Sequence, residues 1–251
     1  MGVHIGTSGW NYKHWQGIFY PKGFPQREWL RYIAAQFDTV EINTSFYRIP
    51  NTESVAQWQC NTPPHFLFAV KLWRGITHYR KLTNSQEFLR RFFDVFEPLH
   101  EKRRAPLLIQ LPPNQGKNPE KLKAFFDDLR ATAPSKWPYA VEFRNDSWLS
   151  DDVYRLLDDE GAALCVHDMR GAGATNEPNT ARVVYMRRHG SGEGKYAGSY
   201  SPEQIRADAG NIRSWASAGR DVFVYYNNDI GGHALMNAHQ LKQELAASGI
   251  L

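Results

Sequence analysis

Short segments rich in β-branched and aromatic residues alternate with longer segments of helical periodicity along the whole chain. Strands are predicted at Val3–Thr7, Thr39–Asn43, Phe66–Lys71, Leu107–Leu111, Ala140–Arg144, Ala163–Asp168, Arg182–Arg187 and Val222–Asn227. Helices are predicted at residues 25–36, 52–60, 84–101, 118–131, 149–160, 201–218 and 233–248. Asn118-Pro119 and Ser201-Pro202 each supply an N-cap residue followed by a proline in the first helical turn.

Strands separated by helices favour parallel pairing through right-handed crossovers, and eight such strands can close a barrel. The sequence therefore predicts a single α/β domain over residues 1–251, a (β/α)8 barrel of the TIM type, with an open doubly wound sheet as the alternative. Residues 171–180 have no helical period, and we expect a long loop there in place of a helix.

Polar residues cluster at the C-terminal ends of the predicted strands. Side chains two apart in a strand share a face, and in a TIM barrel these strand ends form the active site. The polar strand-end residues are Glu41, Asn43, Lys71, Gln110, Glu142, Arg144, His167 (or Asp168 from the other face), Arg187, His189, Asn227 and Asp229. An outward register would bury several charges in apolar packing, so the side chains are expected to converge inside the barrel mouth.

The predicted cavity has more basic than acidic groups. Lys71, Arg144 and Arg187 outnumber Glu41 and Glu142, which favours a small anionic or phosphorylated ligand. We expect Glu142 or Glu41 to act as a general base and His167 or His189 to carry a proton. Substrate-binding residues are expected to be Trp10, Asn43, Tyr47, Lys71, Gln110, Arg144, Arg187 and Asn227. The alternative is that Glu142–Arg144 and Glu41–Lys71 are buried ion pairs that only hold the mouth together.

Six sequence blocks in order resemble a known family. They are Gly6-Thr7-Ser8-Gly9-Trp10-Asn11-Tyr12, Thr39-Val40-Glu41-Ile42-Asn43-Thr44-Ser45-Phe46-Tyr47-Arg48, Phe68-Ala69-Val70-Lys71, Gln110-Leu111-Pro112-Pro113, Val141-Glu142-Phe143-Arg144 and Tyr225-Tyr226-Asn227-Asn228-Asp229. Together they resemble the domain-of-unknown-function family 72, or YecE-like family, through nearly the whole chain. The resemblance implies a TIM-type barrel without an established activity. Its distant likeness to endonuclease IV and xylose isomerase is an analogy of fold.

Other functions are less favoured by the sequence. No organic cofactor is predicted, while a divalent metal stays open, with Glu142, Asp168 and Asp229 as candidate ligands. Two inward glutamates would suit a glycosidase, but neighbouring cations would keep both ionised. The segment 189–195 is rich in glycine but lacks the spacing of a Walker motif.

A nucleic-acid-binding or endonuclease-IV-like processing protein is the second functional class. It would use the basic clusters Lys102-Arg103-Arg104 and Arg187-Arg188 together with aromatic residues at the mouth. The first cluster is expected to end a helix, where cations complement the helix dipole. The chain carries a net charge of only +4, well below that of a protein that coats nucleic acid. A small molecule is therefore the favoured partner.

Composition indicates a cytoplasmic protein without a membrane partner. No apolar segment approaches the roughly 18 residues of a membrane span, and the first residues do not form a signal peptide. Cys60 and Cys165 are both expected to be small core residues rather than a disulfide pair.

Overall fold

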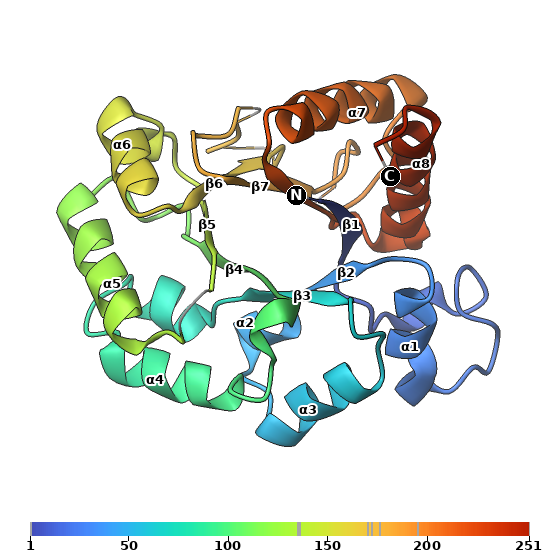
Figure 1. Ribbon diagram of the computed structural model, residues 1–251, viewed down its shortest axis with the longest axis horizontal. Coiled ribbons are helices and arrows are strands. Elements are labelled where there is room, and N and C mark those ends of the chain that lie inside the picture. The colour runs from blue at the N-terminus through green and yellow to red at the C-terminus, as the bar shows by residue number, and fades with distance from the viewer. Residues whose placement is uncertain are drawn as a thin grey trace.

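A closed barrel of eight parallel strands forms the centre of the protein in this computed structural model (Figure 1). The structure describes residues 2–134, 137–169, 171, 173–175, 177–194 and 196–250. The strands are β1 Val3–Ser8, β2 Thr39–Ile42, β3 Leu67–Lys71, β4 Arg104–Gln110, β5 Tyr139–Glu142, β6 Ala163–His167, β7 Val183–Arg188 and β8 Asp221–Tyr226. Strand β1 pairs with both β2 and β8, so the sheet has no open edge and the barrel prediction is confirmed.

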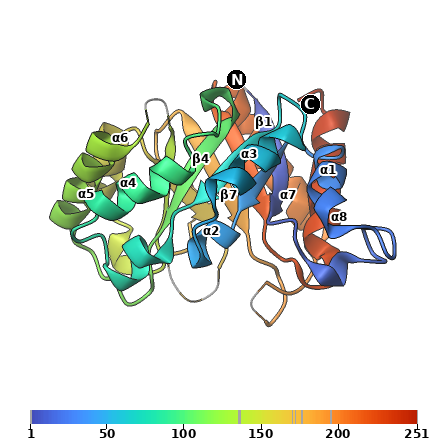
Figure 2. The same cartoon turned by 90° about the horizontal axis from the view of Figure 1, so that it is seen from below.

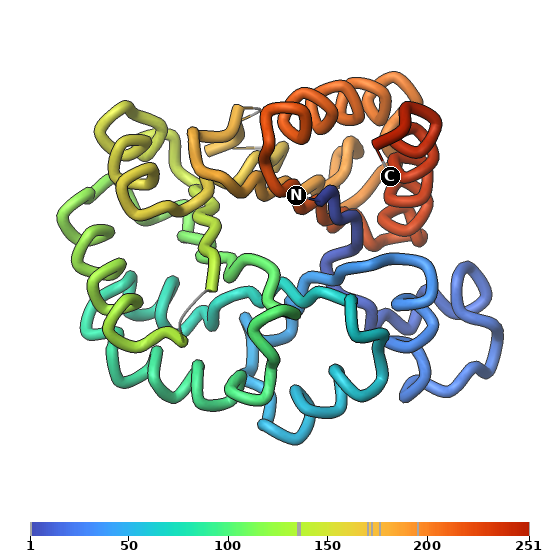
Figure 3. The backbone as a smooth tube through the Cα atoms, in the orientation of Figure 1, coloured from blue at the N-terminus to red at the C-terminus, as the bar shows by residue number. Residues whose placement is uncertain are grey.

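The longer helices surround the barrel in chain order (Figures 1 and 3). The α-helices are α1 Trp29–Ala34, α2 Thr44–Tyr47, α3 Thr52–Cys60, α4 Gln86–Val95, α5 Pro119–Thr132, α6 Asp151–Asp159, α7 Pro202–Ser217 and α8 His233–Ala247. Short 3-10 turns lie at Lys13–Trp15, Gln26–Glu28, Glu101–Arg103, Asp146–Trp148 and Ile230–Gly232, and a π-helix spans Gly75–Tyr79. The predicted caps are present: the side chains of Asn118 and Ser201 accept hydrogen bonds from the first turns of α5 and α7.

The side chains of each strand alternate between the helix-facing side and the inside of the barrel, as predicted. On β5, Val141 packs with the helices in the larger core, whereas Ala140 lies in the smaller core inside the barrel. The smaller core also contains Tyr185 and Tyr225. The inner face thus has a lower layer of alanines and aromatic rings, above which polar residues two positions further along each strand reach the mouth.

The mouth lies at the end of the barrel where the strands terminate. Both chain termini lie at one end, and α2, which directly follows β2, lies toward the other (Figure 2). Residues 173–175 and 177–181 contain no helix between β6 and β7, as predicted for this part of the chain. None of the helices in the described ranges combines the length and apolar character needed to cross a membrane.

Three sequence predictions were wrong. The helix expected at 84–101 spans only Gln86–Val95, and after a turn a 3-10 segment at Glu101–Arg103 leads into β4. Lys102, Arg103 and Arg104 therefore do not end a helix. Arg103 is buried and donates hydrogen bonds to the backbone carbonyls of Phe66, Gln59 and Pro63. Cys60, expected in the core, is exposed at the end of α3, whereas Cys165 is buried as predicted.

Candidate functional site

A buried ion network crosses the barrel beneath the mouth. Arg187 on β7 is fully buried and donates to Glu41 at 2.8 Å and to Glu142 at 2.6 Å. Glu41 also accepts hydrogen bonds from the hydroxyls of Ser8 and Tyr185. Because each carboxylate is held by a guanidinium, the network satisfies charges that would be costly to bury alone. This supports the structural alternative for the two glutamates.

Arg144 completes the network from the cavity side. Its guanidinium is bonded to Glu142, while its side chain keeps 12% exposure. Burial raises the pKa of Glu142, but the cations Arg144 and Arg187 outweigh burial and hold it well below its usual range. Such a carboxylate stays ionised and is a weak base, which argues against Glu142 as the general base.

Lys71 does not form the expected ion pair with Glu41. No described residue accepts a hydrogen bond or ion pair from its ammonium, which lies 4.1 Å from the ring centre of Phe46. The backbone of Lys71 is fixed, since Ser45 on α2 donates to its carbonyl at 2.6 Å. Burial, together with Arg187, lowers the pKa of Lys71 to about 7, against the smaller opposing effect of the two glutamates.

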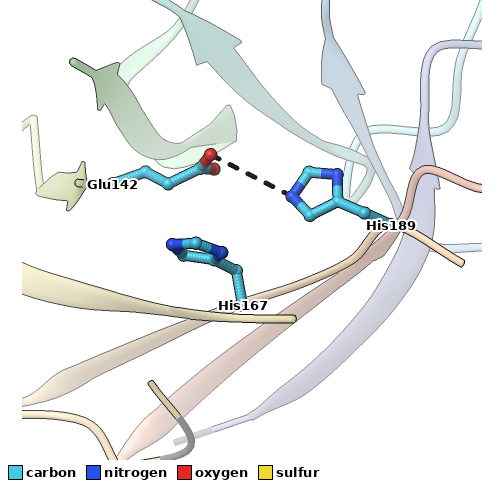
Figure 4. A group of neighbouring side chains, drawn as sticks. All are labelled: Glu142, His167 and His189. Carbon is cyan, nitrogen blue, oxygen red and sulfur yellow. Dashed lines mark ion pairs between the residues drawn. The ribbon is translucent and has the colours of Figure 1, made fainter. Parts of the chain in front are cut away.

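The two predicted proton carriers, shown in Figure 4 with Glu142, differ in how their rings are bonded. His167 is 2.9 Å from the Phe143 carbonyl through Nε2, and its Nδ1 accepts from the Met169 backbone, so both nitrogens have backbone partners. His189 contacts the Asn227 amide through Nδ1 at 3.1 Å, and its Nε2 lies 4.0 Å from Glu142. Burial lowers the pKa of both rings, so both are neutral at pH 7. His167 is positioned as a structural residue.

The residues Glu142, His167 and His189 place possible metal-ligand atoms within 4.8 Å of one another. However, both oxygens of Glu142 already bind guanidiniums, and His167 has no ring nitrogen without a backbone partner. A divalent cation would also meet the charges of Arg144 and Arg187. This donor set fits a metal poorly. Within the described ranges, the group includes neither Asp168 nor Asp229, the other two predicted ligands.

The two aspartates belong to separate contacts. Asp168 accepts hydrogen bonds from the Tyr200 hydroxyl at 2.6 Å and from the His189 backbone at 2.9 Å. Asp229 lies 3.4 Å from His14, at the mouth. Asp168 therefore anchors the segment that carries His189, and Asp229 anchors the segment that follows β1.

Two cavities open at the mouth above the network. The first has a volume of about 380 Å³ and is lined by Gly9, Trp10, Asn11, Tyr12, Asn43, Thr44, Tyr47, Trp58, Lys71, Tyr196, Asn227 and Asp229. The second, of about 370 Å³, is lined by Phe46, Tyr47, Lys71, His78, Gln110, Pro113, Arg144, Met169, Gly171 and Tyr196. Lys71, Tyr47 and Tyr196 belong to both, so the cavities adjoin at these three residues.

Most of the predicted substrate-binding residues line these cavities. Trp10, Asn43 and Asn227 line the first cavity, Gln110 and Arg144 line the second, and Tyr47 and Lys71 line both. Arg187 does not line either one, because it lies within the ion network beneath them. A third cavity of about 210 Å³ is lined by residues 189–190 and 192–194 together with Tyr196, whereas Lys195 is outside the described residues.

Several cavity residues were not predicted from the sequence, among them four with aromatic rings. Tyr12, Trp58, His78 and Tyr196 come from the segment after β1, from α3, from the π-helix and from the β7–α7 segment. None of them is at a strand end, so strand alternation could not find them. The sequence signals for these residues were local: Tyr12 ends the first of the six family-like blocks, and Tyr196 follows a glycine-rich segment.

The features expected for a nucleic-acid surface are largely internal. Arg103 and Arg188 are both buried, and Arg188 pairs with Asp208 at 2.5 Å. Trp15 and Trp148 are buried, and their indole nitrogens donate to backbone carbonyls. These groups hold the scaffold together and leave neither basic cluster as a continuous exposed patch.

Comparisons with known proteins agree on the family. Residues 4–250 match the family described as "Protein of unknown function DUF72". The chain is 27% identical to the UPF0759 protein YunF of Bacillus subtilis, covering 97% of this chain and 94% of that protein. A DUF72 family protein of Thermotoga maritima has a similar structure, with a TM-score of 0.85 and 29% identity, covering 98% of this chain and 100% of that one. D-psicose 3-epimerase of Clostridium cellulolyticum shares the fold alone, at a TM-score of 0.53 and 10% identity over 98% of each chain. The chain therefore belongs to the DUF72 family.

Proposed function

We propose that the protein is an enzyme that binds a small anionic substrate in the mouth cavities. The supporting observation is the charge of the site. Glu41 and Glu142 balance Arg144 and Arg187, and Lys71 remains as a further basic group without an acidic partner among the described residues. An anion at Lys71 would supply the missing countercharge in a partly dehydrated cavity, where the interaction is stronger than in water.

The surrounding residues supply complementary contacts. Arg144 faces the second cavity and can donate to a carboxylate or phosphate. Asn43 and Asn227 offer polar contacts in the first cavity, whose wall of Trp10 and Trp58 is apolar. His189, a neutral ring beside both Glu142 and Arg144, is the proposed proton carrier. Glu41 and Glu142 then act as positioning residues that hold Arg187 and Arg144.

Anion binding provides the test. Oxalate, phosphoglycolate and inorganic phosphate would be titrated by calorimetry into the wild type and into the Lys71→Met and Arg144→Gln variants, with exposed Lys102→Met as the matched control. We expect each cavity substitution to weaken binding by at least about tenfold, the loss of one charge-assisted contact. The control should bind as the wild type does. The proposal is refuted if neither cavity variant binds the anions more weakly than the wild type does. It is also refuted if none of the three anions binds to the wild type.

The charge of Lys71 predicts a pH dependence for this binding. An anion favours the protonated amine, whose pKa is about 7 in the free protein. The affinity should therefore decrease above pH 7, by up to about tenfold per pH unit, and binding at pH 7 should take up protons from the buffer. Calorimetry in buffers of different ionisation enthalpy measures that uptake. A uniform affinity between pH 6 and 9 would contradict the role of Lys71.

A further inference from the structure

Lys71 lies where the two mouth cavities meet. The residue is 5% exposed and lines both cavities, so its side chain borders a ligand bound in either one. Its backbone is fixed between β3 and α2, and its amine contacts the Phe46 ring instead of a carboxylate. The amine is therefore held in place and is not neutralised by an ion pair.

The groups that face Lys71 keep a large share of the amine uncharged. Arg187 from β7 and Arg144 from β5 lower its pKa, as burial does, while Glu142 and Glu41 raise it. His78, from the π-helix after β3, lines the same cavity, and burial together with Lys71 lowers its own pKa to about 4. With a pKa of about 7, Lys71 is about half deprotonated at neutral pH. Burial next to other cations is a recognised way to make a lysine nucleophilic.

We propose that Lys71 is a catalytic nucleophile that forms an imine with a small aldehyde or ketone carrying a carboxylate or phosphate group. The anionic group would be bound by Arg144, which borders the same cavity. The inference deepens the proposed function and rests on it, because Arg144 must bind the anion that brings the carbonyl to the amine.

The reaction balances without a further reactant. The amine nitrogen of Lys71 adds to the carbonyl carbon, and one proton passes from nitrogen to the carbonyl oxygen. The hydroxyl then takes one proton from the solvent and leaves as water as the C–O bond breaks, while the second proton stays on nitrogen, so a protonated C=N bond forms. The protonated imine withdraws electrons from the adjacent carbon, so the enzyme would act on a bond next to the former carbonyl. The partly apolar wall of the first cavity limits the water available to reverse imine formation.

Reductive trapping tests the proposal directly. Wild-type protein would be mixed with sodium borohydride and either glyoxylate, pyruvate or dihydroxyacetone phosphate, digested, and analysed by peptide mass spectrometry. Acetone serves as the uncharged carbonyl, and exposed Lys102 as the reference lysine in the same digest. With at least one charged carbonyl, we expect Lys71 to be modified at least about tenfold more than Lys102, since an ordinary lysine of pKa near 10.4 is almost fully protonated at pH 7.

Two further measurements separate the possible failures. The Arg144→Gln variant should lose a larger share of its trapping with the charged carbonyl than with acetone, because Arg144 lowers the pKa of Lys71 for both reactions but binds only the anionic group. In the wild type, acetic anhydride at pH 7 should acetylate Lys71 faster than Lys102. Equal trapping at both lysines with every charged carbonyl overturns the imine proposal, whether or not acetylation is fast. If oxalate or phosphoglycolate still binds in an Arg144-dependent way, the proposed anion-binding function survives that result. If neither trapping nor anion binding occurs, both proposals fall.

Discussion

Replacing Lys71 with methionine should stabilise the protein, although it removes the residue that we place at the centre of the site. Methionine keeps most of the volume of the buried stem and has no charge to bury. The pKa of Lys71 is lowered from 10.5 to about 7. Each unit corresponds to about 1.4 kcal/mol, so keeping this amine in the folded protein costs on the order of 4 kcal/mol at pH 7. In a chain of this length such a gain would raise Tm by roughly 10 °C.

The dependence on pH identifies the cause of the stabilisation. Below pH 7 the amine is protonated in both the folded and the unfolded protein, and burial of the charged amine lowers the free energy of unfolding by its full amount. Between pH 7 and 10.5 the unfolded chain binds more protons than the folded one, so the stability of the wild type increases with pH. The advantage of Lys71→Met should therefore be largest near pH 6 and should shrink by several kcal/mol toward pH 9.5.

Urea unfolding at pH 6 and at pH 9.5, at constant ionic strength, measures both effects. The Lys102→Met variant controls for the loss of an exposed lysine and should match the wild type at both pH values. The reasoning is refuted if Lys71→Met is no more stable than the wild type at pH 6. It is also refuted if the difference between them is the same at pH 9.5, because a packing effect would not depend on pH.

Three other predictions address the ion network and the metal question. Arg187→Met should lower the free energy of unfolding by about 3–5 kcal/mol, since it leaves the buried Glu41 without a cationic partner and Glu142 with Arg144 alone, and an unchanged urea midpoint would contradict this. Glu142 has a lowered pKa in the folded protein, so its contribution is present above about pH 4.5 and lost as the pH falls below that value. Glu142→Gln should therefore be less stable at pH 6 and lose less further stability between pH 5 and 3, whereas parallel losses would count against the ion pairs. EDTA should leave Tm unchanged and elemental analysis should find no stoichiometric metal, because guanidiniums occupy the Glu142 oxygens. A metal that disappears in Glu142→Gln would reverse that conclusion.

The barrel could be predicted because two simple periodicities specify it. Apolar residues such as Val141 and Val166 alternate with small or polar ones on the same strands, and only one register keeps the charges out of the helix-facing core. The short elements were missed for an equally physical reason. The four residues of α2 and the five of the π-helix are too few to show a period, and hydrogen bonds such as the one from Ser45 to Lys71 hold α2 in place.

The sequence predicted which residues form the site, but it did not predict which of them form ion pairs with one another. Strand alternation correctly placed Glu41, Lys71, Glu142 and Arg187 on the inner face. It did not show how far each side chain reaches across the barrel. The structure pairs Glu41 with Arg187, not with Lys71, because the guanidinium of Arg187 on β7 bridges the carboxylates on β2 and β5. Pairings across a barrel depend on side-chain reach in three dimensions, which a pattern along the chain does not contain.

The three basic side chains of the site, those of Arg187, Arg144 and Lys71, have different interaction partners, and these differences indicate a different role for each. Arg187 is fully buried and bridges two carboxylates, so it can hold the barrel together but cannot reach a ligand. Arg144 shares one of those carboxylates and still faces a cavity, so it is oriented by the network and available to an anion. Lys71 has neither a carboxylate nor full exposure, which is the most costly arrangement of the three for folding. Methionine would fill the same space without that cost. Stability therefore does not account for a lysine at this position, whereas the proposed chemistry at its amine does.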